Sequence, residues 1–352
     1  MNTLIPSPDT LPVAWGYFQL LLLLMFPIHL LFMNAMLGST AISLYARLKG
    51  GEPHERLAHE LAKVLPFLVA FTVNFGVATL LFLQVNFGNL FYTSSVLMAV
   101  YWLSVPFILI VAYYALYLYD FKFTVLGRKG IVFVALALAI FLVIPFIFTN
   151  NMTLMLDPRQ WSAYFGHRGG TLLNGDIAVV VPRYLHFVNG GLAVGGLFVA
   201  AFGRLKEKRD PHLGELAVSL GMSLFTVLTL LQVMDGFWFL ISLPLPVRLL
   251  FLGGDAKSTA LLAAGLLLAL LALGAGFTRK VFPGAALVLP LVYVMVFIRD
   301  ALRTGYLKPF FTPDMLKVAP QYSPLILFAV TLTCGIGTIV WMLRKTVGIY
   351  RS

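Results

Sequence analysis

Residues 130–148 read GIVFVALALAIFLVIPFIF, a run of about nineteen residues without one charged side chain. A helix needs about 20 mostly apolar residues to cross the hydrocarbon core of a bilayer. The run is apolar on every side, whereas a strand of a membrane barrel alternates apolar and polar residues. Because a helix satisfies its own backbone hydrogen bonds in lipid, this segment is predicted to be a membrane-spanning helix.

Eight further stretches share this length and composition. They lie near residues 14–46, 64–84, 96–119, 181–203, 215–242, 258–278, 284–302 and 323–343. The whole chain is 60% hydrophobic and only 11% charged, with a mean hydropathy of +0.92, while soluble proteins carry roughly 25% charged residues. These values exclude a soluble enzyme, a disordered chain and a secreted disulfide scaffold. The sequence predicts an all-α integral membrane protein with nine transmembrane helices in one domain, residues 1–352.

Lysine and arginine predict the orientation of this bundle. The chain has 25 Lys and Arg against 14 Asp and Glu. Most of the basic residues follow the odd-numbered spans or lie in the C-terminal tail, and residues 1–10 contain none. The positive-inside rule therefore predicts an external N-terminus and a cytoplasmic C-terminus in a cell (inner) membrane. The same rule explains the excess of basic residues, so no nucleic-acid partner is needed to account for it. Residues 50–63 are expected to form a solvated helix that connects the first two spans.

Two histidines are the main candidates for chemistry, because ionisable residues inside a membrane are costly and often functional. His29 lies midway in the first span, and His186 lies about one turn into the fifth. A neutral imidazole on an inward face of a helical bundle can ligate haem iron. The glycines after His186 leave room for a flat macrocycle, namely Gly190, Gly191, Gly195 and Gly196. The alternative is that both histidines are packing residues and the glycines are ordinary helix contacts.

The depths of the two histidines favour separate sites. At 1.5 Å per helical residue they differ by ~6–15 Å along the bundle. Each iron then needs a second ligand or keeps an open position, and methionine is one known second ligand. Helical methionines that could serve are Met25, Met33, Met36, Met222, Met234 and Met295, although core packing is their usual role. The single cysteine, Cys334, excludes cysteine-ligated clusters and the attachment motif of a c-type haem.

Arginines near the external ends of the spans are candidate partners of haem propionates, which arginine binds through paired hydrogen bonds. These residues are Arg183, Arg248, Arg299 and Arg303. They could instead extend to lipid headgroups. Asp300 is one helical turn from Arg303 and could pair with it or with Arg183. The partner of Asp235, in the sixth span, does not follow from the sequence.

Several segments resemble subunit I of the cytochrome bd quinol oxidase family. The similar stretches are NFGVATLLFLQVNFGNLFY (74–92), FTNNMTLMLDPRQW (148–161), RYLHFVNGGLAVGGLF (183–198), LQVMDGFWF and SPLILFAVTLTCGIGTIVWML (323–343). The resemblance implies nine helices, an external N-terminus and haem-ligating histidines at His29 and His186.

The chain also departs from that family's pattern. The family's large loop between its sixth and seventh helices takes part in quinol binding, but here the connection is only residues 243–257. No acid stands in the third span, and no carboxylate stands near Tyr293, where the family has a haem-ligating glutamate. The seventh span also lacks the family's methionine ligand.

These departures favour electron transfer over oxygen reduction, because oxygen reduction at a buried iron needs a path for protons. The sequence predicts a membrane b-type cytochrome subunit with one or two haem b groups. It is expected to pass electrons between the quinone pool and an external partner, either a c-type cytochrome or a second membrane subunit. The open alternatives are a divergent quinol:oxygen oxidase, a haem-free transporter and a structural membrane anchor.

Overall fold

The computed structural model describes residues 4–166 and 168–349, with side chains as far as residue 346. These residues are almost entirely helical and contain no β-strand. The one extended pairing among them is an isolated bridge between Leu11 and Val318. The predicted all-α class is therefore confirmed.

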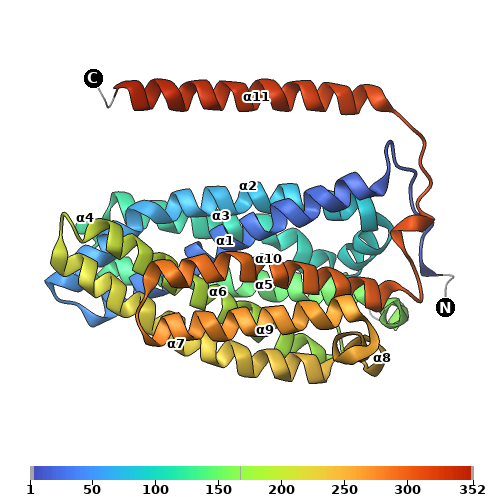
Figure 1. Ribbon diagram of the computed structural model, residues 1–352, viewed down its shortest axis with the longest axis horizontal. Coiled ribbons are helices and arrows are strands. Elements are labelled where there is room, and N and C mark those ends of the chain that lie inside the picture. The colour runs from blue at the N-terminus through green and yellow to red at the C-terminus, as the bar shows by residue number, and fades with distance from the viewer. Residues whose placement is uncertain (1–3, 167, 350–352) are drawn as a thin grey trace.

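Within the described ranges, nine helical segments are long and apolar enough to cross a membrane (Figure 1). They are α1 (Trp15–Lys49), α2 (Glu52–Leu97), α3 (Ala99–Phe121), α4 with α5 (Phe123–Leu126 and Gly130–Leu156), α6 (Ile177–Lys206), α7 (Pro211–Ser242), α9 (Ala256–Phe277), α10 (Val281–Leu307) and α11 (Tyr322–Ile349). All except α11 lie side by side in one bundle. The short elements α4 and α8 mark its two ends, which are called here the α4 end and the α8 end.

Glycines bring α1, α6 and α7 into close contact. A Cβ atom on Gly38 of α1 would lie 2.4 Å from the Cα atom of Gly195 in α6. A Cβ atom on Gly221 of α7 would lie 2.4 Å from the carbonyl oxygen of Gly196. Since real Cβ atoms do not approach backbone this closely, only glycine allows these helices to pack as they do. Gly195 and Gly196 are therefore helix-packing residues, which agrees with the packing alternative for these two glycines and not with a place in a cofactor pocket.

The second span is longer than predicted. Helix α2 runs for 46 residues, with a non-helical backbone conformation at Phe87. It includes residues 52–63, which were predicted to form a separate solvated helix. Leu57 and Leu61 are completely buried in this segment, because its apolar face packs against α1 and α6–α7 residues. The predicted connecting helix is therefore a continuation of the second span with one buried face, while Glu52, Arg56 and Lys63 on it are exposed.

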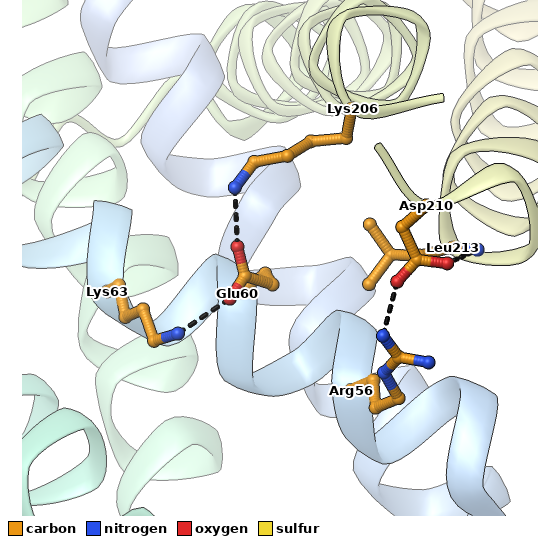
Figure 2. Close-up of polar contacts among 6 residues, drawn as sticks. All are labelled: Arg56, Glu60, Lys63, Lys206, Asp210 and Leu213. Atoms are coloured by element: carbon orange, nitrogen blue, oxygen red, sulfur yellow. Dashed lines mark hydrogen bonds and ion pairs between the residues drawn. The ribbon is translucent and has the colours of Figure 1, made fainter. Parts of the chain in front are cut away.

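Ion pairs join α2 to the α6–α7 connection at the α4 end (Figure 2). Glu60 accepts hydrogen bonds from Lys63 at 2.6 Å and from Lys206 at 2.7 Å. Arg56 pairs with Asp210, whose other carboxylate oxygen accepts a hydrogen bond from the first turn of α7. These side chains are partly solvated, so each pair contributes at most about 1 kcal/mol. They fix the position of the α6–α7 connection more than they stabilise the bundle.

The connection between α7 and α9 is compact. It forms the short helix α8 (Leu245–Leu249) and a π-helical turn, Leu250–Gly254. Within it, Val247 and Phe251 are buried against the apolar cluster that also contains Trp161. This short connection closes the bundle at the α8 end.

Helix α11 stands apart from the bundle (Figure 1). The segment before it is hydrogen-bonded along the backbone to the N-terminal segment, from Leu11 to Lys317 and from Ala319 to Leu11, both at 2.8 Å. None of the residues in its membrane-spanning stretch, Tyr322–Thr346, is buried. Such an apolar surface is compatible with contact to lipid.

Candidate cofactor site

His29 lies in the middle of α1 and faces α2. Its Nδ1 atom is 2.9 Å from the carbonyl oxygen of Thr72. A carbonyl oxygen can only accept, so Nδ1 carries the proton and Nε2 keeps its lone pair. Gly76, one turn beyond Thr72, makes room for the ring, because a Cβ atom there would lie 2.7 Å from Cε1 of His29. The imidazole is thus held in the tautomer that binds a metal through Nε2.

His186 lies nine residues after the start of α6 and faces α7. Its Nε2 atom is 3.0 Å from Nε2 of Gln232, and its Nδ1 atom is 3.8 Å from Oδ2 of Asp235. Gly236 leaves space for the ring, since a Cβ atom there would lie 3.2 Å from Cε1. The structure therefore identifies two polar neighbours of Asp235, His186 and Asn189, which the sequence left open. It also adds Gln232, which the sequence analysis did not select. Gln232 is a polar residue in an apolar helix and lies three residues before Asp235, and this spacing could have indicated that the two share a face.

The two histidines line two different cavities. The His29 cavity has a volume of about 490 Å³ and lies among α1, α2, α3 and α5, with residues of α6 and α10 on one side. The His186 cavity has a volume of about 300 Å³ and lies among α6, α7, α9 and α10. Both volumes fall in the range of 300–1,000 Å³ that is typical of small-molecule sites. This placement agrees with the depth estimate, which favoured two sites over one shared iron.

The wall between the cavities contains arginine. Arg183 and Arg299 line both cavities, whereas Arg303 lines only the His29 cavity. Arg183 is 6% exposed, and Arg299 is half-buried with its Cζ atom 4.5 Å from the ring centre of Phe26 and 5.4 Å from that of Phe187. These contacts are within the distance of a cation–π interaction. Three of the four predicted arginines are therefore gathered at one place, near the α8 end.

The charges of this arginine cluster are only partly balanced. Arg303 pairs with Asp300, as the sequence suggested, and Asp300 also accepts a hydrogen bond of 2.8 Å from Gln19. Among the described residues, Arg183 and Arg299 have no hydrogen-bond or ion-pair partner. A buried charge without a partner costs several kcal/mol. The cluster is therefore suited to bind carboxylate groups that the chain itself does not provide.

Other predicted residues divide between the cavities and the rest of the bundle. Gly190 and Gly191 line the His186 cavity together with Met295, while Met33 and Met36 line the His29 cavity. The remaining candidates are elsewhere. Met25 lines neither cavity, Met222 is in the apolar core and Met234 is exposed. Arg248 donates to the carbonyl oxygen of Ile241.

The comparisons with known proteins leave the family open. A scan against protein-family models finds no match for the chain, and no curated protein matches it in sequence. The resemblance to cytochrome bd subunit I therefore stays a prediction from the quoted motifs.

The residues present fit a haem in each cavity. Each cavity offers one histidine, an apolar lining, and access to arginines that can bind propionates. No group of three or more His, Cys, Asp or Glu side chains gathers in the described part of the chain. A haem needs only one or two protein ligands because its ring supplies the other four, whereas a bare metal ion needs a larger set.

Proposed function

We propose that the chain is a membrane b-type cytochrome subunit with two haem sites, one at His29 and one at His186. The observation that carries this proposal is the pair of cavities, each with one histidine, which share two arginines without a carboxylate partner. Haem supplies the one-electron redox chemistry when it is bound. The protein would supply His29 and His186 as axial ligands and Arg183, Arg299 and Arg303 as partners of propionates.

Electron transfer is a better match to the His29 cavity than oxygen reduction. Of the described residues that line this cavity, Asp300 is the one carboxylate. It is already held by Arg303 and Gln19, so it is poorly placed to deliver protons to an iron at His29. By the resemblance, the electrons would pass between the quinone pool and an external c-type cytochrome or second membrane subunit. The basic α4 end would face the cytoplasm.

The first test is a reduced-minus-oxidised spectrum with haem extraction and quantification. The protein should be expressed with haem supplied and with its native partners, and purified in detergent. We expect haem b at close to two groups per chain. A folded preparation without haem would contradict the proposal. Oxygen uptake with a reduced quinol should be slow, and a fast cyanide-sensitive rate would favour the oxidase alternative.

A haem-free transporter is the second candidate, favoured by the polar groups of the His186 cavity. Nδ1 of His186, Oε1 of Gln232 and both carboxylate oxygens of Asp235 are buried without a hydrogen bond among the described residues. Such groups inside a membrane can form an ion pathway. Proton or cation uptake into liposomes by a haem-free preparation, lost in Asp235→Asn, would establish this function instead.

A further inference from the structure

The His186 ring lies between two polar residues of α7. On one side, its Nε2 atom is 3.0 Å from the amide nitrogen of Gln232. On the other side, its Nδ1 atom is 3.8 Å from Oδ2 of Asp235. Gln232 and Asp235 are three residues apart, so they project from the same face of α7. The ring is therefore flanked along its edge by a neutral amide and a carboxylate.

The donors and acceptors of these groups fix the tautomer of His186. An amide nitrogen only donates, so Nε2 of His186 must be the acceptor and hold a lone pair. Nδ1 then carries the proton, which faces the carboxylate of Asp235. The opposite tautomer would place a lone pair of Nδ1 against a carboxylate oxygen, which is repulsive. Nε2 thus keeps the lone pair that a metal would need, and Gln232 donates to that lone pair in this structure.

Asp235 has two polar neighbours, Nδ1 of His186 and the side-chain amide of Asn189 in α6. Asp235 is 7% exposed, and neither of its carboxylate oxygens has a hydrogen bond within the described structure. Nδ1 of His186 is likewise buried and without a hydrogen bond. A buried donor and a buried acceptor each carry a desolvation cost when they are unpaired. A hydrogen bond between them offsets that cost. A Cβ atom at Gly236 would lie 3.2 Å from Cε1 and 3.6 Å from Nδ1 of His186, so glycine at this position keeps the edge of the ring uncrowded.

We propose that Asp235 is a positioning residue for His186: it accepts the Nδ1 proton, fixes the plane of the imidazole and keeps Nε2 free for iron. The inference rests on the proposed cytochrome function. Metal-ligating histidines commonly donate their second nitrogen to a carboxylate, which makes the imidazole a stronger electron donor. Asp235 then stabilises the oxidised iron relative to the reduced iron at this site. Gln232 must release Nε2 when the metal binds.

Two substitutions separate the effects of charge and position. Asp235→Asn keeps an acceptor but removes the charge, so the haem that depends on His186 should become easier to reduce. We expect about a tenfold change in its reduction equilibrium, which is about 59 mV for one electron. Asp235→Ala removes the acceptor as well, and the affinity for this haem should fall about 10–100-fold. Redox titration and haem titration measure these two quantities.

Asp210→Asn is the matched control, because it removes one carboxylate from the opposite end of α7 and asparagine can still cap the helix. It should change neither quantity. Asp235→Glu is a further variant for the case in which the other variants fold poorly. Because it keeps the carboxylate, the reduction potential of the haem at His186 should stay near that of the wild type. If the wild-type protein binds haem and Asp235→Asn, Asp235→Ala and Asp235→Glu all match it, the positioning role is wrong and the cytochrome proposal stands. A wild-type protein without haem contradicts both.

Discussion

The His29 and His186 cavities hold similar imidazoles with different partners. His29 donates to a neutral backbone carbonyl, that of Thr72, whereas His186 faces a carboxylate, that of Asp235. Both leave Nε2 as the nitrogen that can bind iron, but only the carboxylate adds negative charge. The His29 cavity also has one more arginine, Arg303, although Asp300 balances it. The comparison teaches that the fold can give two haems different reduction potentials, with the higher potential expected at His29.

The largest effect is expected from removing each histidine. His186→Ala should abolish one haem signal, and His29→Ala should abolish a second and distinct one, while the protein still inserts into membranes. Each variant should retain about half of the wild-type haem, because each cavity has its own ligand. Reduced-minus-oxidised spectra with haem quantification measure this. Loss of the same signal in both variants would show that the histidines share one iron.

Gly76→Ala should affect the His29 site alone. The added Cβ atom would lie 2.7 Å from Cε1 and 2.9 Å from Nδ1 of His29, so the ring must move away from Thr72. We expect the affinity for the haem at His29 to fall by about tenfold, as for the loss of other second-shell contacts.

Gly16→Ala is the control for that substitution, because a Cβ atom there meets nothing within 4 Å. It lies in α1, the helix that carries His29, and should leave both signals intact. Equal losses in the two variants would show that helix propensity, and not the space beside His29, causes the effect.

Arg299→Met should affect both sites, because Arg299 lines both cavities. Loss of a positive charge near two irons should lower both reduction potentials, each by about 59 mV for a tenfold change in equilibrium. In the haem-free protein the same change removes a half-buried charge without a partner, so thermal stability should rise. A shift of only one potential would contradict the shared wall.

The smallest effect is expected at the start of α9, which lines the His186 cavity only. Hydrogen bonds from the side chain and backbone of Ser258 lower the pKa of Asp255 below its usual 3.8. Because this pKa is lowered in the folded state, the ionised carboxylate stabilises the folded state at pH values above the usual pKa. This contribution to stability is lost as the pH falls through the lowered pKa. Amide exchange in the first turn of α9 should therefore accelerate below about pH 4. In Asp255→Ala the amides of the first turn of α9 should exchange rapidly at every pH. A wild-type exchange rate in this variant at neutral pH would contradict the role of Asp255 in holding that turn.

The sequence predicted the spans because composition alone separates membrane helices from connections. It did not predict the continuation of α2 through residues 85–97, since Asn86 and Asn89 there resemble loop residues. Asn86 instead donates to the start of α1 at Trp15, and Asn89 donates to Pro6 in the segment before it. It also could not show that α11 lies away from the bundle. Helix packing depends on which faces meet, and residues that are apolar on all sides carry little information about faces.

The candidate site was predicted in part. Both histidines and four arginines were chosen because charge is rare inside a membrane, and the structure brings three of the arginines together. The pairing of His186 with Asp235 depends on the relative register of α6 and α7, which close contact at Gly196 and Gly221 sets. That register is a tertiary property, so a single sequence did not reveal it.

The most direct test of two separate sites is a cryo-electron microscopy map of the haem-loaded protein. The account predicts two flat densities per chain, one against Nε2 of His29 and one against Nε2 of His186, with Arg183 and Arg299 between them. A single density that bridges the two histidines, or cavities filled only by lipid in a preparation that retains haem, would contradict it.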